Sequence, residues 1–233
     1  MNTILSAQSI KREVDTKSGL LTILDDVSLE LRAGESVAIQ GASGSGKSSL
    51  LGVLAGLDIP QQGKVVIEGR EITDLDEDQR AVLRANNVGF VFQSFYLIDD
   101  LTALENVALP LELFGHADPI ATATDWLERL GLGDRIGHLP RQLSGGEQQR
   151  VALCRAFAVQ PKILFADEPT ANLDTRSAAH LMDLFVTLNA ERDITFVIST
   201  HDTRVMGYTR RLISMRDGKI VGDEQQEPRS MGD

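Results

Sequence analysis

The chain has 233 residues, of which 42% are hydrophobic and 24% are charged, as is ordinary for a globular α/β protein. Its 34 acidic and 23 basic residues leave a formal net charge of −11, and no basic stripe typical of a nucleic-acid-binding protein is visible. No apolar run reaches the roughly 18 residues that a membrane-spanning helix needs, and residues 1–10 lack a signal-peptide pattern. We therefore expect a cytoplasmic protein that meets a membrane only through a partner.

Short apolar runs alternate with helical patterns along the chain, which predicts an α/β fold with a mostly parallel sheet and helices on its faces. Buried strands are expected at residues 35–40, 88–92, 162–166 and 194–200. Residues 27–31 alternate apolar and polar side chains, as a strand with one solvent-exposed face does, and Gly34 ends this run. Together with residues 63–68, it indicates a small antiparallel β element beside the core.

A phosphate-binding loop follows the first buried strand. Residues 41–48 match the pattern G-x-x-x-x-G-K-[ST] in full, between a strand-like segment and a helical pattern over residues 48–56. Glycines let backbone N–H groups approach phosphates closely, and the helix N-terminus adds the positive end of its dipole. We expect Lys47 to neutralise the β- and γ-phosphates and the Ser48 hydroxyl to hold Mg²⁺. The predicted nucleotide-binding residues of this segment are Gly41, Ala42, Ser43, Gly44, Ser45, Gly46, Lys47, Ser48 and Ser49.

From about residue 94 to residue 137 the strand signal fades and helical periodicity takes over. We interpret residues 94–158, approximately, as an α-helical subdomain inserted into a core of residues 1–93 and 159–222. Residues 1–222 would then form one domain of the P-loop NTPase (RecA-like) type. Residues 223–233 are polar and are predicted to form a frayed tail.

Three helices are expected in the inserted block. Residues 102–105 form a capping box that opens the first helix, and residues 122–130 form the second, closed by Gly131. The third, residues 147–158, contains Cys154 among apolar neighbours. As the single cysteine, Cys154 excludes an intramolecular disulfide, and we predict a buried, inert thiol.

Two adjacent carboxylates, Asp167 and Glu168, follow the apolar run of residues 163–166. The carboxyl ends of parallel strands border the crevice in which α/β sheets bind ligands, so this strand would deliver both acids to the site. Asp167 is expected to hold Mg²⁺ through water. Glu168 is expected to orient and deprotonate the attacking water.

With Ser144-Gly145-Gly146 added, the ordered motifs resemble those of ATP-binding-cassette (ABC) ATPases over residues 4–221. The resemblance implies that ATP is clamped between two copies of the chain, with these three residues acting on the γ-phosphate held by the facing copy.

The same resemblance assigns the remaining site residues. Gln93 would sense the γ-phosphate and contribute to the metal site with Ser48 and Asp167. His201 would contact the γ-phosphate, and Asp174 would act from the facing copy as part of the D-loop, residues 171–174. The expected catalytic residues are Lys47, Gln93, Glu168 and His201.

The branch of the family can also be recognised. Residues 92–97, 101–107 and 166–170 resemble the MacB/LolD branch. Within it, Arg84 and residues 88–92 and 143–153 are most similar to the bacterial YbbA ATPases. The resemblance implies a homodimeric ATP-hydrolysing subunit on the cytoplasmic face of the bacterial inner membrane. It would drive a membrane permease in lipid or lipoprotein extraction or in mechanotransmission. The alternative is a soluble ABC ATPase that acts on nucleic acid or the ribosome, although the chain has neither a long coiled-coil insertion nor a second cassette.

Base recognition departs from the family pattern. Such cassettes usually stack adenine on an aromatic ring ahead of the first core strand, but no aromatic residue precedes Phe90, and Val14 lies where the ring is expected. Stacking on an aromatic is worth ~1–3 kcal/mol per base in nucleic-acid complexes, so its absence should weaken base selectivity. We expect the steady-state kcat/KM for GTP to lie within about tenfold, or about 1.4 kcal/mol, of that for ATP. A larger preference for ATP in a phosphate-release assay would contradict this prediction.

Overall fold

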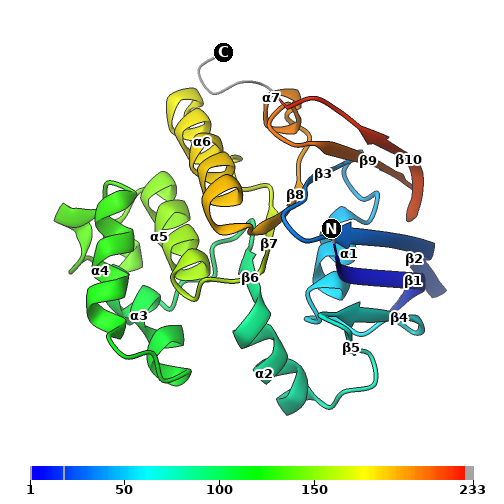
Figure 1. Ribbon diagram of the computed structural model, residues 1–233, viewed down its shortest axis with the longest axis horizontal. Helices are drawn as coiled ribbons and strands as arrows, with labels where there is room; N and C mark the ends of the chain where they lie inside the picture. The colour runs from blue at the N-terminus through cyan, green and yellow to red at the C-terminus, as the bar shows by residue number, and fades with distance from the viewer. Residues whose placement is uncertain (1, 18, 229–233) are drawn as a thin grey trace.

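The computed structural model describes residues 2–17 and 19–228, and its centre is a six-stranded sheet in the order β10-β9-β3-β8-β7-β6 (Figure 1). The strands are β3 (Ser36–Gln40), β6 (Val88–Val91), β7 (Ile163–Asp167), β8 (Thr195–Ser199), β9 (Arg211–Arg216) and β10 (Lys219–Gln225). All neighbouring pairs are parallel except β9 and β10. The predicted mostly parallel sheet is therefore confirmed, and its four predicted strands agree with β3, β6, β7 and β8 to within one residue at each end.

A four-stranded antiparallel sheet in the order β2-β1-β4-β5 lies beside this core. Its strands are β1 (Thr3–Thr16), β2 (Gly19–Arg32), β4 (Gln62–Ile67) and β5 (Arg70–Glu71). The predicted strand of residues 27–31 is only the last part of β2. Because the pairing of β1 with β2 shifts register at several points, the alternation of apolar and polar residues is broken along the rest of this hairpin.

Helices cover the central sheet, and Figure 1 shows α3, α4 and α5 gathered on one side of the molecule with α6 next to them. Their bounds are α1 (Lys47–Leu54), α2 (Glu77–Asn87), α3 (Ala103–Leu113), α4 (Pro119–Arg129), α5 (Gly145–Ala158), α6 (Thr175–Arg192) and α7 (Thr203–Met206), with 3₁₀ turns at Gly133–Arg135 and Pro140–Gln142. Within residues 2–17 and 19–228, no helix has the length and apolar character needed to cross a membrane.

Helix starts follow the capping residues in the sequence. Thr102 caps α3 with its hydroxyl, as predicted, and the Glu105 side chain completes the capping box. Helix α4 begins at Pro119, three residues before the predicted start, because the Asp118 carboxylate accepts a 3.2 Å hydrogen bond from the Ala121 N–H and caps the helix there.

Helix α5 packs against α4 and α6 through aromatic contacts. The Phe157 ring stacks on Trp126 of α4 at 5.4 Å and meets Phe185 of α6 edge-on at 5.5 Å. Cys154 is fully buried in the same cluster, where its Sγ–H donates to the Trp126 carbonyl, and burial raises the pKa of the thiol. The prediction that this thiol is buried is confirmed.

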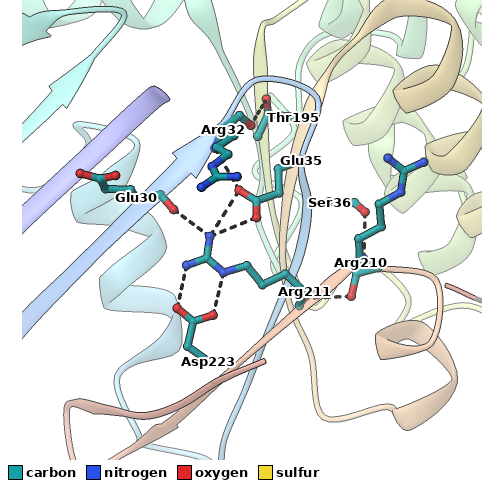
Figure 2. Close-up of polar contacts among 9 residues, drawn as sticks. Glu30, Arg32, Glu35, Ser36, Thr195, Arg210, Arg211 and Asp223 are labelled. Carbon is teal, nitrogen blue, oxygen red and sulfur yellow. Dashed lines mark hydrogen bonds and ion pairs between the residues drawn. The ribbon is translucent and has the colours of Figure 1, made fainter. Parts of the chain in front are cut away.

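Arg211 of β9 forms hydrogen bonds that connect β10 to the rest of the structure (Figure 2). Its Nε and Nη2 each donate to Asp223 at 2.7 Å, and its Nη1 donates to Glu35 at 3.1 Å and to the Glu30 carbonyl at 2.8 Å. These hydrogen bonds from Arg211 hold the pKa of Asp223 below its usual range. The predicted tail was therefore wrong in its first three residues, because β10 continues to Gln225. Residues 229–233 lie outside the described residues.

Candidate nucleotide site

The phosphate-binding loop connects β3 to α1 and is shaped by close backbone contacts. A Cβ added at Gly41 would lie 2.5 Å from the Met215 carbonyl, and one added at Gly46 would lie 2.8 Å from the Ile23 carbonyl, so neither position has room for a side chain. Gly46 also has a φ of +100°, in the region that favours glycine. The Lys47 ammonium lies over the loop and donates to the Gly41 carbonyl at 2.9 Å and to the Ala42 carbonyl at 3.1 Å.

A cavity of about 630 Å³ opens in front of this loop. The predicted site residues that line it are Gly41, Ala42, Ser43, Gly44, Gly46, Lys47, Ser48, Ser49, Gln93, Asp167, Glu168 and His201. Ile23 of β2 also lines the cavity, and nothing in the sequence singles out this apolar residue. Ser45 is not in the lining, because its side chain is buried beneath the loop, where its Oγ has no hydrogen-bond partner in the described part of the chain.

The acidic side of the cavity lies at the adjacent carboxyl ends of β7 and β8. The Ser199 hydroxyl donates to Asp167 Oδ1 and accepts a 3.2 Å hydrogen bond from the Glu168 N–H. Glu168 has a φ of +49°, which is unusual for a residue with a side chain. Its N–H also donates to the Ser199 carbonyl at 3.1 Å. The end of β8 therefore supports a strained conformation at Glu168 that turns the chain toward the cavity.

Glu168 and His201 meet at the mouth of the cavity. His201 Nδ1 lies 2.9 Å from Glu168 Oε1. The Glu168 side chain is 13% exposed and that of His201 is 76% exposed. The hydrogen bond with Glu168, reinforced by the carboxylate charge, raises the pKa of His201 above its ordinary value. Glu168 and His201 thus form a hydrogen-bonded pair in the cavity lining, where both side chains can contact a bound phosphate or a water molecule.

The donor set at the cavity fits a magnesium ion. The Ser48 hydroxyl, the Gln93 amide and the Asp167 carboxylate all line it, and oxygen atoms are the ligands that Mg²⁺ prefers. In residues 2–17 and 19–228 no group of three or more His, Cys, Asp or Glu side chains is arranged to hold a metal alone. In the usual Mg²⁺ site one or two carboxylates act together with substrate phosphates, so Asp167 would supply the carboxylate here and Ser48 and Gln93 neutral oxygen atoms.

The remaining predicted site residues, Ser144, Gly145, Gly146 and Asp174, are not in the lining of this cavity. Ser144 caps α5 through a reciprocal pair of bonds, because its N–H donates to Glu147 Oε2 at 2.8 Å and its Oγ accepts from the Glu147 N–H at 3.3 Å. These bonds, the first being the larger cause, lower the pKa of Glu147 to about 2. The predicted helix start at this motif is confirmed.

The start of α5 lies next to the loop before α6. A Cβ added at Gly146 would lie 3.5 Å from the Leu173 side chain and 3.6 Å from the Asn172 carbonyl. Asp174 then caps α6, since its Oδ1 accepts from the Arg176 and Ser177 N–H groups at 3.0 Å each. The two motifs expected to act on a facing copy are thus neighbours, and neither contributes to the cavity of its own chain.

Comparisons with known proteins agree with this geometry. The sequence profile of the ABC transporter family matches residues 24–171. The chain is 48% identical over 219 residues to the ABC transporter ATP-binding protein YbbA of Escherichia coli, covering 93% of this chain and 96% of that protein. It is 45% identical over 225 residues to the lipoprotein-releasing system ATP-binding protein LolD of Aquifex aeolicus, covering 96% and 98%.

A solved structure supports the same conclusion. The dimeric structure of a post-hydrolysis state of the ATP-binding cassette MJ0796, bound to ADP and Pi, matches with a TM-score of 0.93 and 38% identity, over 96% of this chain and 99% of that chain. Fold, motif order and sequence identity therefore agree. The chain belongs to the ABC transporter family, as an ATP-binding and ATP-hydrolysing cassette of the branch that includes LolD and MacB.

Proposed function

We propose that two copies of this chain bind ATP and Mg²⁺ between them, and that ATP hydrolysis drives a membrane permease. The main support is that the expected site residues lie on two separate surfaces of the chain. One cavity gathers Lys47, Gln93, Glu168 and His201, whereas the motif at the start of α5 is exposed on a different surface of the same chain. A second copy facing the first would supply that motif, and the dimeric form of the MJ0796 cassette supports this arrangement.

The residues of each chain have distinct roles in this proposal. ATP phosphates would take over the Lys47 ammonium from the Gly41 and Ala42 carbonyls that now accept its hydrogen bonds. The first N–H groups of α5 in the facing copy, at Gly145 and Gly146, have no acceptor within their own helix and would bind the γ-phosphate. Asp174 of that copy would border the same site.

Hydrolysis would depend on the pair at the mouth of the cavity. Glu168 would accept a proton from the attacking water, and His201 would hold the γ-phosphate oxygen. Mg²⁺, held by Ser48, Gln93 and Asp167, would neutralise phosphate charge. Loss of the γ-phosphate removes the negative charge on which donors from both copies converge, so the copies separate.

An apolar cavity of about 390 Å³ supports the permease as partner. Its lining includes Leu57, Phe92, Ile98, Leu113 and Phe114, and all of these except Phe92 are at least 40% exposed. Exposed apolar side chains gathered around one groove are typical of a protein-binding surface, and an amphipathic helix fills such a groove well. We propose that a cytoplasmic helix of the permease lies here, which places this chain on the cytoplasmic face of the bacterial inner membrane.

The name of LolD, a lipoprotein-releasing system protein, supports lipoprotein extraction as the work performed. Extraction of other lipids and mechanotransmission stay part of the proposal. A soluble ABC ATPase acting on nucleic acid or the ribosome is the second candidate. The net charge of −11 makes it the weaker one, because nucleic-acid binders carry basic surfaces.

A pull-down separates the two candidates. Tagged Glu168→Gln protein would be captured from detergent-solubilised native membranes with Mg-ATP, and Lys47→Ala protein would serve as the matched control that cannot hold ATP. We expect mass spectrometry to identify a stoichiometric multi-span membrane protein with the first variant only. Ribosomal or DNA-repair proteins in its place would support the soluble ATPase and contradict the transport role.

A further inference from the structure

The turn after Gln93 has an uncommon backbone. Phe95 and Tyr96 are consecutive residues with φ values of +57° and +46°. A side chain is disfavoured in this left-handed region because Cβ approaches the following carbonyl oxygen, and such residues usually occur singly. Two hydrogen bonds within the turn help to hold it, from the Tyr96 N–H to the Ser94 carbonyl at 2.6 Å and from the Phe95 N–H to the Phe92 carbonyl at 3.3 Å. The conformation still requires support from outside the turn.

Arg155 supplies that support from α5. Its Nη1 donates to the Tyr96 carbonyl at 2.7 Å, and its Nη2 donates to the Phe95 carbonyl at 2.8 Å. In the part of the chain that the structure describes, no carboxylate forms an ion pair with Arg155. Burial without such a partner lowers the pKa of its guanidinium. Placing a half-buried cation against two backbone carbonyls, with no carboxylate beside it, has a desolvation cost. Its planar pair of donors matches the two adjacent carbonyl groups.

The turn lies between the two cavities described above. Gln93 lines the nucleotide cavity, whereas its neighbour Phe92 and Arg155 itself line the apolar cavity. Arg155 is also part of the helix that begins at Gly145. One helix therefore presents the motif for the facing copy at its start and holds the Gln93 loop near its end.

We propose that Arg155 is a positioning residue that holds the turn at Phe95 and Tyr96 in its left-handed conformation and thereby sets the place of Gln93 in the nucleotide cavity. The inference rests on the proposed function of that cavity and adds a residue that connects it to the apolar groove. Without Arg155, both turn residues relax toward negative φ, and Gln93 moves with them. The phosphate-binding loop is untouched, so ATP binding is retained while the hydrolytic step loses an aligned group.

The first test compares Arg155→Gln with Arg155→Lys by steady-state ATP hydrolysis. For Arg155→Gln we expect kcat to fall at least about fivefold while KM for ATP stays within about twofold, the pattern of an interaction needed in the transition state. Arg155→Lys keeps the charge but lacks the planar pair of donors, so its kcat should lie between those of Arg155→Gln and wild type. Hydrogen exchange should become faster in residues 94–98 of both variants.

The second test is a rescue that a purely structural role would not produce. Tyr96→Asn and Tyr96→Thr are each placed in the Arg155→Gln and Arg155→Lys backgrounds. Tyr96 is 66% exposed, and both replacements remove the same ring contact with Phe92. Asn adopts the left-handed conformation readily, whereas a β-branched residue there is an outlier. We expect Tyr96→Asn to restore part of kcat and Tyr96→Thr to lower it further.

Thermal unfolding and the fluorescence of Trp126, the single tryptophan, verify that each variant is folded. If Arg155→Gln does not fold, the Arg155→Lys background carries the rescue test. Gln93→Ala distinguishes a failure of the positioning role from a failure of the role proposed for Gln93. If Gln93→Ala lowers kcat but Arg155→Gln and Arg155→Lys do not, or if the two Tyr96 variants behave alike, the positioning role is wrong and the proposed function stands. If Gln93→Ala itself leaves kcat unchanged, the role proposed for the cavity residue fails, and the positioning role fails with it.

Discussion

Glu168→Gln is expected to bind ATP with nearly unchanged affinity, to form a dimer that does not separate, and to lose at least about 100-fold in kcat. The carboxylate lies at the mouth of the nucleotide cavity, 2.9 Å from His201 Nδ1, and an amide of the same shape cannot accept a proton from water. Because the γ-phosphate is then never removed, the donors of both copies stay engaged. Phosphate release measures the loss, and size-exclusion chromatography with Mg-ATP measures the dimer.

The matched control for this variant is Glu191→Gln, the same change on an exposed residue near the end of α6. It should hydrolyse ATP at the wild-type rate, and because its dimers separate after hydrolysis, it should show no lasting dimer peak in size-exclusion chromatography. Near-wild-type hydrolysis by Glu168→Gln would refute its role as general base. Loss of ATP binding would mean that the side chain contributes to binding ATP rather than to the hydrolytic step.

Mixing two inactive variants is expected to restore hydrolysis. Glu168→Gln disables the cavity of its own chain, whereas Gly145→Asp places a negative charge where the facing γ-phosphate would lie. The Gly145 position tolerates the change, because an added Cβ meets no atom within 4 Å and an acidic residue is favourable in the first turn of a helix. In a mixed dimer, one site combines an intact cavity from the Gly145→Asp chain with an intact α5 start from the other chain.

Mixing equal amounts before ATP is added should give an initial rate of about a quarter of the wild-type rate, since about half of the first dimers are mixed and each has one intact site. The initial rate is the measure, because Glu168→Gln homodimers do not separate and withdraw chains from later exchange. The matched control mixes Glu168→Gln with Lys47→Ala. Both changes lie in the cavity half of the site, so no mixed dimer has an intact site and no activity should return. If Gly145 acted on the cavity of its own chain, the first mixture would remain as inactive as the control.

Several features of the chain could be predicted because the interactions behind them are local. The phosphate-binding loop, the capped starts of α3 and α5 and the strand before Asp167 each depend on residues within a few positions of one another. Their hydrogen-bonding and φ requirements restrict which residue types can occur there. The start of α4 was misplaced because the cap at Asp118 lies before the helical pattern on which the prediction was based.

Other features depend on partners far apart in the chain. The long β1–β2 hairpin pairs with irregular register, and β10 extends into the predicted tail because Asp223 meets Arg211 and through it Glu35. The residues next to Asp223 and Arg211 in the sequence give no sign of this contact. A polar C-terminal segment is therefore predicted to be a tail, because the arginine that it binds lies in another strand.

The family, the order of the motifs and the residue types that face a nucleotide could be read from the printed chain, since they follow from short-range patterns. Which of those motifs share a cavity depends on folding, which brings Gln93 and Glu168 into it and leaves Gly145 outside. Folding also brings Arg155 to the carbonyl groups of Phe95 and Tyr96, 60 and 59 positions away. The physical reason is that such contacts are set by how helices and strands pack, and a single arginine in a helical pattern carries no record of the carbonyl groups that it will meet.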